Sequence, residues 1–320
     1  MTVAPLLRLS AWPTPLDPAP RLASALGLHP GDLWVKRDDL TDLGGGNKVR
    51  KLEHLVAEAV AGGATVLVTS GGAQSNHARM TAAAAARLGL GAVLVLAGTP
   101  SAERPGNLAL DGLLGARVVA VGDVDGAALE RRVEEVAGRL RDDGEVPAVL
   151  PLGGSSPTGA RGYLTCAAEL RAQAPDAAHV VVAVGSGGTM AGLVAGLGGD
   201  RVLGVDTGAV PDPAERVAGL VAALGVSGAP VRLRHDQVGT GYGVLTAAAA
   251  AAMRTAARTE GLLLDPVYTA KALAGLAAAV TDGSIRPGER TVFVHTGGLP
   301  GLFGHSVAAA LAARVLADPT

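Results

Sequence analysis

Cysteine is almost missing from this chain of 320 residues, in which Cys166 is the only one. One cysteine can form neither an internal disulfide nor a thiolate metal cluster, so a reducing compartment fits best. Long apolar runs are missing too, and the first residues lack the charged flank and apolar stretch of a secretion signal. The sequence therefore predicts a cytoplasmic protein that does not enter a membrane.

An excess of either charge is also absent, because 27 basic residues face 29 acidic ones and the net charge is -2. Without a basic field, nucleic acid is not an expected partner. Two catalytic patterns are missing as well, namely the G-x-S-x-G turn of hydrolases and a histidine pair spaced H-x-x-x-H. We therefore expect no bound metal, and we expect the partner to be a small molecule.

Lysine is scarce, since 23 of the 27 basic residues are arginines. A guanidinium group stays protonated and cannot act as an amine nucleophile. Chemistry that requires a free amine must therefore use one of four lysines. These are Lys36, Lys48, Lys51 and Lys271.

Short apolar runs alternate with helical patterns, which is typical of parallel strands joined by crossover helices. The predicted strands are 33–36, 65–69, 92–96, 117–121, 180–184, 202–205 and 291–294. The predicted helices are 49–61, 76–88, 127–141, 159–173, 189–197 and 246–259. The fold class is therefore α/β, and the apolar strands are expected to be buried on both faces. The segment 151–157, PLGGSSP, is the best candidate for a crossing between two domains.

The segment 44–53, GGGNKVRKLE, places three glycines before a helix whose first turn carries Lys48, Arg50 and Lys51. The positive end of a helix dipole disfavours each cation by typically ~0.3–1 kcal/mol, and a bound anion would resolve this conflict. The same field would lower the pKa of Lys48, and imine formation requires an uncharged amine. The alternative is a solvated helix start with its basic residues facing water.

Two further loops join a predicted strand to a helix. In segment 71–79, GGAQSNHAR, the amides of a helix start suit a substrate carboxylate, although ordinary capping by Ser75 or Asn76 also explains the pattern. In segment 185–189, GSGGT, the glycines let the backbone approach a phosphate. Asp206 follows at the spacing of a dinucleotide fold, but Met190 replaces the last glycine of G-x-G-x-x-G, so a dinucleotide site is the weaker interpretation.

Aromatic residues number only seven, and the three tyrosines all stand in segments rich in glycine or turns: Tyr163, Tyr242 and Tyr268. Each can present its hydroxyl to a cleft or lie half-buried in the core. The segment 294–301, VHTGGLPG, ends a strand at the edge where α/β proteins bind ligands. We expect Thr296 to point its hydroxyl into that cleft.

Six motifs, in order GGGNKVRKLE, GGAQSNHAR, GSGGT, GYG, DPVYTAKALAGL and HTGGLPG, resemble those of the D-cysteine desulfhydrase and 1-aminocyclopropane-1-carboxylate deaminase family. The resemblance implies a homodimeric pyridoxal-phosphate enzyme of fold type II, with two parallel-sheet α/β domains similar to the β subunit of tryptophan synthase. It further implies a large cofactor-binding domain, residues 1–46 plus 156–320, and a small domain, residues 47–155.

The same resemblance assigns roles to individual residues. It implies that Lys48 carries pyridoxal 5'-phosphate as a Schiff base. The other cofactor-binding residues would be Lys51, Asn76, Gly185, Ser186, Gly187, Gly188, Thr189 and Thr296, with Asn76 at the phenolic oxygen of the cofactor. The substrate side would be lined by Gln74, Ser75, Asn76, His77 and Thr269. The catalytic residues would be Lys48, Ser75, Tyr242 and Tyr268.

Two threonines favour the desulfhydrase branch, because the deaminase branch has a glutamate and a leucine where this chain has Thr269 and Thr296. A neutral hydroxyl at the pyridine nitrogen stabilises a protonated ring less than a carboxylate does, which favours rapid loss of a β leaving group. The implied reaction is α,β-elimination from D-cysteine to pyruvate, ammonia and sulfide. The deaminase remains an alternative, and Arg161 keeps an L-cysteate sulfo-lyase open, since it would favour an anionic leaving group. An alternative from another class is a nucleotide- or anion-binding protein without catalytic activity.

Overall fold

The computed structural model describes residues 7–317, which divide into two compact units. Unit 1 comprises 7–9, Leu52–Gly154 and 299–317, and unit 2 comprises Ser10–Lys51 and Ser155–Gly298. Each unit is built around a sheet of its own.

Unit 2 contains a six-stranded sheet in the order β1-β2-β10-β7-β8-β9. Its strands are β1 (Leu16–Pro18), β2 (Leu33–Lys36), β7 (His179–Val184), β8 (Val202–Asp206), β9 (Arg232–Arg234) and β10 (Thr291–Val294). β1 pairs with β2 in antiparallel orientation, and the other pairs are parallel. The helices are α1 (Pro20–Ala25), α6 (Pro157–Gln173), α7 (Gly188–Leu197), α8 (Pro213–Ala223), α9 (Ala247–Glu260) and α10 (Thr269–Thr281).

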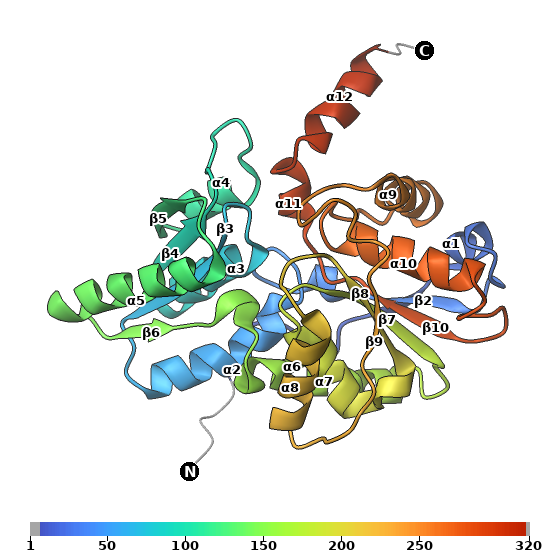
Figure 1. Cartoon of the computed structure of the whole chain (residues 1–320), viewed down its shortest axis with the longest axis horizontal. Coiled ribbons are helices and arrows are strands. Elements are labelled where there is room, and N and C mark those ends of the chain that lie inside the picture. Colours follow the sequence, from blue (N-terminus) through green and yellow to red (C-terminus); the bar gives the residue numbers. More distant parts are fainter. Residues whose placement is uncertain (1–6, 318–320) are drawn as a thin grey trace. The chain divides into compact units, whose positions relative to one another are not determined.

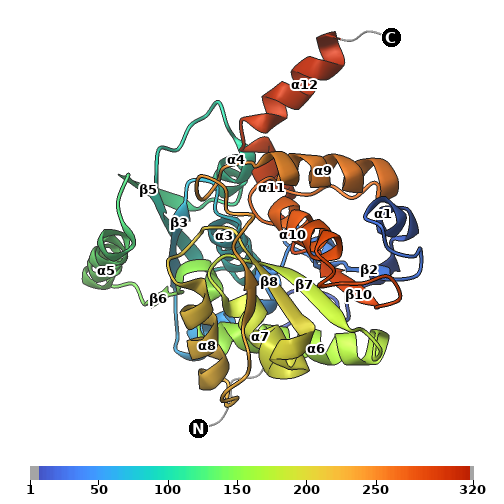
Figure 2. The same cartoon turned by 45° about the vertical axis from the view of Figure 1, so that its right-hand side comes forward.

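The central strands of unit 2 send alternate side chains into two cores, one on each face of the sheet. On β7, Val181 and Ala183 pack with α1, α9 and α10, whereas Val180 and Val182 pack with α6, α7 and α8. Figures 1 and 2 show α9 and α10 on one face and α6 and α7 on the other. With both faces covered, ligands have access at the carboxyl ends of the parallel strands, where the loops after β7 and β10 begin.

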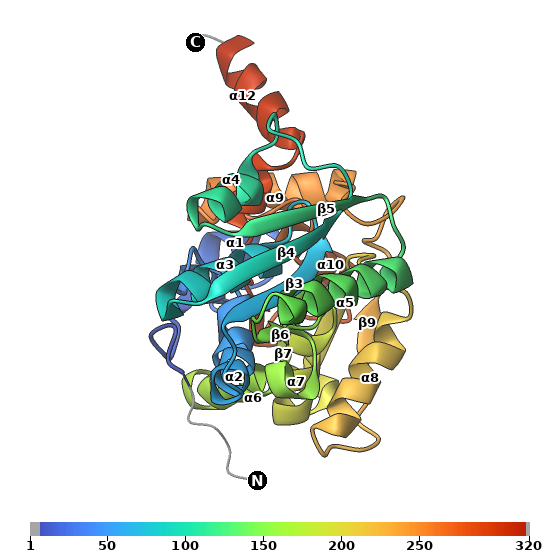
Figure 3. The ribbon, with the colours of Figure 1, turned by 90° about the vertical axis from the view of Figure 1, so that its left-hand side faces the viewer.

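Unit 1 contains a four-stranded parallel sheet in the order β5-β4-β3-β6. Its strands are β3 (Val66–Gly72), β4 (Gly91–Ala97), β5 (Arg117–Gly122) and β6 (Pro147–Val149). Its helices are α3 (Asn76–Leu88), α4 (Gly106–Leu113), α5 (Gly126–Asp142), α11 (Leu299–Phe303), α12 (Val307–Ala317) and most of α2 (Lys48–Ala61). Figure 3 shows α3 and α5 on opposite sides of this sheet, and α5 packs on valines of β3 and β4.

All seven predicted strands and all six predicted helices are present, with differences only at their ends. The three strands that the sequence did not indicate, β1, β6 and β9, have three residues each, too few for an alternating pattern to stand out. The expectation of burial on both faces is wrong for β5. This strand lies at the edge of its sheet and exposes most of its side chains, including 38% of Val118.

The division into units falls after Gly154, within the segment predicted as a crossing. It departs from the expected boundaries, 1–46 plus 156–320 and 47–155, in residues 7–9, 47–51, 155 and 299–317. Residues 7–9 and 299–317 group with unit 1, because Glu53 accepts a hydrogen bond from the Leu9 amide and α11 contacts α4. Residues 47–51 group with unit 2, because Lys51 hydrogen-bonds to Ser155. Along 7–317, no helix is long and apolar enough to cross a membrane.

Candidate active site

Three of the four lysines are held by partners in unit 2. The buried Lys36 amine lies 2.6 Å from a carboxylate oxygen of Glu169, and the Lys51 amine lies 2.9 Å from the hydroxyl oxygen of Ser155. The Lys271 amine donates hydrogen bonds to three backbone carbonyls. Each of these amines has a hydrogen-bond or ion-pair partner within unit 2.

Lys48 is the exception. Its amine makes no hydrogen bond or ion pair to any residue within 7–317. The side chain is partly buried at the first residue of α2, and burial lowers its pKa to about 8. The uncharged form of Lys48, which can attack a carbonyl group, is therefore more populated near neutral pH than in an ordinary lysine.

A polar cradle lies next to this amine, at the start of α7. The Ser155 hydroxyl is 2.7 Å from the Ser186 hydroxyl and accepts a hydrogen bond from the Gly188 amide. A Cβ atom on Gly188 would lie 2.7 Å from Ser155 Oγ and 3.1 Å from Lys51 Nζ. Only glycine therefore leaves room at this position, and the next amide, that of Thr189, has no hydrogen-bond partner within 7–317.

The cradle is rich in positive charge. Burial, followed by the nearby charges of Lys48 and Arg216, holds the pKa of Lys51 well below its ordinary value. Arg216 on α8 also donates a hydrogen bond to the Ser186 carbonyl. Such a cluster at a helix N-terminus would be stabilised by an anion with two negative charges, and a phosphate monoester has this charge.

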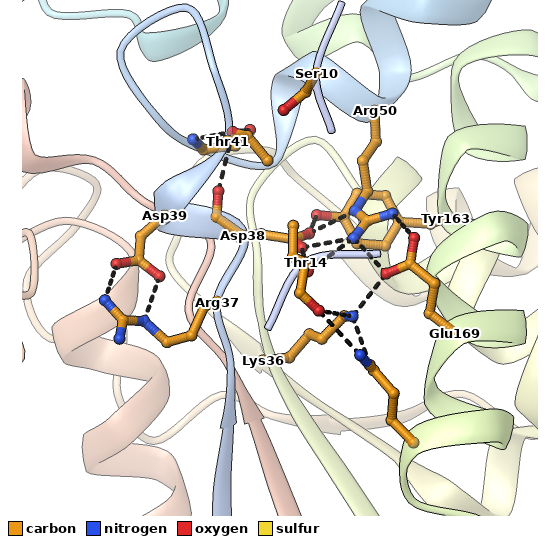
Figure 4. A network of polar contacts seen from close by, with 12 residues as sticks. Ser10, Thr14, Lys36, Arg37, Asp38, Asp39, Thr41, Arg50, Tyr163 and Glu169 are labelled. Carbon is orange, nitrogen blue, oxygen red and sulfur yellow. Dashed lines mark hydrogen bonds and ion pairs between the residues drawn. The ribbon is translucent and has the colours of Figure 1, made fainter. Parts of the chain in front are cut away.

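Arg50, the third cation of the same helical turn, does not belong to this cradle. It is buried and pairs with two carboxylates, with its Nη2 2.8 Å from Asp38 Oδ1 and its Nη1 2.8 Å from Glu169 Oε1 (Figure 4). Although burial lowers the pKa of Arg50, the charge of Asp38 raises it overall. Tyr163 is buried and donates its hydroxyl to Asp38 at 2.5 Å, so this tyrosine has a structural position. The network fixes the turn of α2 that carries Lys48 and Lys51.

The other two tyrosines form a pair in unit 2. Their hydroxyl oxygens are 2.5 Å apart, and the rings of Tyr242 and Tyr268 meet edge to face. The carbonyls of Val238 and Gly241, which accept from Lys271, hold the loop before Tyr242. Burial holds the pKa of Tyr268 well above its ordinary value, so its phenol stays protonated at neutral pH. The pair can therefore donate a hydrogen bond as a neutral phenol.

Thr269 and Thr296 differ in how their hydroxyl groups are used. The Thr269 hydroxyl donates to the buried Asp265 carboxylate at 2.7 Å, and that carboxylate also accepts from three backbone amides at the start of α10. The Thr296 hydroxyl has no hydrogen bond to any described residue, and its backbone carbonyl accepts from the Asn47 amide. Of the two hydroxyl groups, only that of Thr296 is free to meet a ligand.

In unit 1, the predicted carboxylate-binding loop lies at the start of α3. Ser75 is the N-cap residue, and its hydroxyl oxygen accepts from the Ala78 amide. Asn76 Oδ1 accepts from Asn107, and the Gln74 side chain is occupied by the Asn107 amide and the Arg104 carbonyl. His77 is buried, at 2% exposure. The expected role of Gln74 in substrate binding is therefore weakened, since the oxygen and the nitrogen of its side-chain amide are both hydrogen-bonded within the protein.

The chain matches the family model described as "Pyridoxal-phosphate dependent enzyme" over residues 7–297. The chain belongs to this family. The family is pyridoxal-phosphate dependent, and the residues of the cradle suit the charge of that cofactor's phosphate. A dianion beside Lys48 and Lys51 would compensate two charges that burial makes unfavourable.

Individual relatives of this pyridoxal-phosphate-dependent protein carry two different names. A Pyrococcus abyssi protein, named as an assumed 1-aminocyclopropane-1-carboxylate deaminase, is 41% identical over 93% of each chain. A Klebsiella pneumoniae protein named D-cysteine desulfhydrase is 40% identical over 95% of this chain and 97% of its own. The crystal structure of a 1-aminocyclopropane-1-carboxylate deaminase homologue is 35% identical, with a TM-score of 0.88 over 98% of this chain and 96% of its own.

Likeness to a threonine deaminase from Solanum lycopersicum, at 20% identity and a TM-score of 0.63, extends over 89% of this chain and supports the fold alone. Together these similarities confirm the predicted family and its fold of two parallel-sheet α/β domains. The sheet of unit 2 is mixed only because β1 is antiparallel.

Sequence reasoning identified most of the polar groups in unit 2 and missed three. Ser155, Arg216 and Asn47 were not among the candidates, although Asn47 donates to the Thr189 hydroxyl at 2.9 Å. Ser155 lies in the PLGGSSP segment, and a serine beside the predicted crossing was the available signal. Arg216 lies on α8, a helix that the sequence did not indicate. Asp206, the acid of the dinucleotide alternative, is bound by His235 and by the Gly208 amide.

Proposed function

We propose that this protein is a carbon-sulfur lyase that performs α,β-elimination on a small amino acid, with D-cysteine as the foremost substrate and sulfide as the leaving group. The observation that carries the proposal is the Lys48 amine, which has no partner within 7–317, has a pKa lowered to about 8, and lies beside a cationic cradle. Bound pyridoxal phosphate would withdraw electrons from the α carbon of the substrate. Lys48 would hold the cofactor and take the α proton.

The phosphate of the cofactor would be held by two sets of donors. Lys51, Ser155 and Ser186 supply side chains, and Thr189 supplies its backbone amide, which has no partner within 7–317. The hydroxyl of Thr296, which is free within 7–317, would meet the ring nitrogen. A neutral hydroxyl there stabilises a ring proton less than a carboxylate would, which favours expulsion of a leaving group over prolonged storage of charge in the ring.

The substrate carboxylate would bind at the start of α3. Because the Ser75 oxygen accepts from Ala78, its own hydrogen is free to donate outward, next to the amides of the first helical turn. The pair formed by Tyr242 and Tyr268 would donate a hydrogen bond to the leaving thiolate, since the raised pKa of Tyr268 keeps that phenol protonated.

A second candidate is 1-aminocyclopropane-1-carboxylate deaminase, which the name of the Pyrococcus abyssi relative favours. Against it, the one carboxylate in contact with Thr269 is that of Asp265, which is already bound by backbone amides. An L-cysteate sulfo-lyase is a third candidate, in which Arg161 would favour an anionic leaving group. Arg161 is exposed on α6. A binding protein without catalysis is the candidate from another class.

Product identification separates these candidates. Purified protein loaded with pyridoxal phosphate is incubated with D-cysteine, L-cysteine, L-cysteate and 1-aminocyclopropane-1-carboxylate, and sulfide, sulfite, pyruvate and 2-oxobutyrate are measured. We expect sulfide and pyruvate in equal amounts from D-cysteine. Release of 2-oxobutyrate alone would instead assign the deaminase, and sulfite alone the sulfo-lyase.

Lys48→Ala and Lys48→Arg provide the control for catalysis. Both variants should retain the thermal unfolding of the parent chain and lose at least about a thousandfold in rate. Full turnover by both would contradict the proposal. The proposal also includes a homodimer and a cytoplasmic location, and light scattering of the purified protein tests the first of these.

A further inference from the structure

Asn107 on α4 is a buried hydrogen-bonding centre in unit 1, with 0% exposure. Its side-chain oxygen accepts from Arg79 Nε at 3.1 Å. Its side-chain nitrogen donates to Asn76 Oδ1 at 2.7 Å and to the Gln74 carbonyl at 3.0 Å. Its backbone amide donates to Gln74 Oε1 at 2.8 Å. One residue thus joins the loop before α3 to the first turn of that helix.

The direction of these bonds follows from the chemistry of arginine. A guanidinium group has donors only, so the end of the Asn107 amide that faces Arg79 must be its oxygen. The nitrogen of Asn107 must then face Asn76, and the atom of Asn76 that meets it must be an oxygen. The remaining end of the Asn76 amide is its NH₂ group. This group donates no hydrogen bond to any residue within 7–317.

Burial keeps this chain of bonds in place. Arg79 is 1% exposed, and the carboxylate of Asp111, one turn after Asn107 on α4, attracts it. The short helix α11 closes the cluster, since a Cβ atom on Gly301 would lie 3.9 Å from both Asn107 Nδ2 and Asn76 Oδ1. The bond between Arg79 and Asn107 is therefore buried, and the bonds from Asn107 to Gln74 and Asn76 are partly buried.

We propose that Asn107 is a positioning residue that fixes the amide of Asn76 with its NH₂ group, rather than its oxygen, directed at the phenolic oxygen of the bound cofactor. The inference rests on the proposed function, in which Asn76 meets that oxygen. A donor there stabilises the ionised phenolic oxygen, whereas the reversed amide would present an oxygen and repel it.

Asn107→Asp reverses the polarity with almost no change of shape. The aspartate still accepts from Arg79, but its second oxygen cannot donate to Asn76 Oδ1. The Asn76 amide should therefore turn over, donate to residue 107, and present its oxygen to the cofactor. In the holoenzyme, the ratio of ionised to neutral cofactor, read from its two absorbance bands, should fall at least about tenfold at a fixed pH.

Two further variants show whether Asn107 acts through Asn76. Asn76→Ala should lower the same ratio, and adding Asn107→Asp to Asn76→Ala should change it no further, because the coupled residue is then missing. Asn107→Ala introduces no charge and should give a smaller fall in the same direction, which keeps the test available if Asn107→Asp fails to fold.

The possible failures are distinguishable. An unchanged ratio in both Asn107→Asp and Asn107→Ala, together with a fall in Asn76→Ala, would overturn the role of Asn107 and leave the proposed function intact. Additive effects of Asn76→Ala and Asn107→Asp would likewise overturn it. A wild-type chain that acquires no lysine-bound absorbance band with pyridoxal phosphate would instead overturn the proposed function.

Discussion

Units 1 and 2 each place a glycine-rich loop between a buried parallel strand and a helix, yet they equip the two helix starts differently. At α3 in unit 1, the Ser75 side chain caps the helix and neutral amides surround it. At α7 in unit 2, Gly187 is the N-cap residue with φ 90, the Ser155 hydroxyl accepts from the Gly188 amide, and two lysines and an arginine lie close by. In the proposed function, the same local structure therefore serves a carboxylate in one unit and a phosphate in the other.

The two units also differ in their buried and clustered cations, which gather in unit 2. Unit 2 keeps its cations in two groups, one balanced by Asp38 and Glu169 and one left for a ligand. The first group stabilises the fold, and in the proposed function the second group binds the phosphate of the cofactor. Variants that remove one group at a time should therefore separate folding from cofactor binding.

Asp38→Asn should have the largest effect, because it leaves the buried Arg50 without one of its two carboxylates. We expect the free energy of unfolding to fall by about 3–5 kcal/mol, measured by urea denaturation of the cofactor-free protein. Asp17→Asn is the matched control, since its partner Arg37 is on the surface and the loss should be under about 1 kcal/mol. Equal losses in the two variants would contradict the structural role of the buried network.

Gly188→Ala should weaken binding of pyridoxal phosphate by about 10- to 100-fold, because the added methyl group meets Ser155 and Lys51. Titration of the cofactor-free protein with pyridoxal phosphate measures this change. Gly72→Ala tests the other loop, and nothing lies within 4 Å of the added atom there. An unchanged cofactor affinity in Gly188→Ala would place the phosphate somewhere other than the start of α7.

The rate at which the cofactor attaches should depend on pH through Lys48. Burial lowers the pKa of Lys48 to about 8, so the neutral, reactive amine increases up to that pH and is dominant above it. The rate constant should rise about tenfold per pH unit between pH 6 and 7.5 and level off above pH 8, measured by stopped-flow absorbance. A rate that continues to rise beyond pH 10 would mean that Lys48 keeps its ordinary pKa.

Ser75→Ala should have the smallest effect on stability, about 1 kcal/mol, through loss of the cap on α3. The KM for substrate should nevertheless rise several-fold with no change in cofactor affinity, because the lost hydroxyl belongs to the carboxylate-binding loop. Thr246→Ala removes the equivalent cap of α9, where the hydroxyl accepts from the Ala249 amide at 3.1 Å. An equal rise in KM in both variants would show that Ser75 acts on stability alone.

The sequence allowed the strands, the loops that follow them and the position of Lys48 to be predicted, because these depend on local patterns of apolar residues and glycine. The partners within each unit could not be predicted in this way. Lys51 and Ser155 are separated by 104 positions, and Arg50 reaches Glu169 across 119. Three adjacent cations therefore looked like one basic cluster, although Arg50 is part of the folded core.

The same limit applies to unit 1. The pattern GGAQSNHAR indicated a helix start with polar side chains, but nothing local marked Asn107 as the residue that orients Asn76 and occupies Gln74. Asn107 lies 31 positions after Asn76, on a helix that the hydrophobic pattern did not reveal. The orientation of a side-chain amide is set by its hydrogen-bond partners. It can therefore be assigned only when those partners are known from the structure.

The central claim is that Lys48 alone among the lysines holds the cofactor, and its most direct test is chemical trapping. The holoenzyme is reduced with borohydride, digested, and the residue carrying the pyridoxyl group is located by mass spectrometry. The account predicts that the modification is on Lys48, and on neither Lys51 nor Lys271. Modification of one of those residues, or of none, would contradict it.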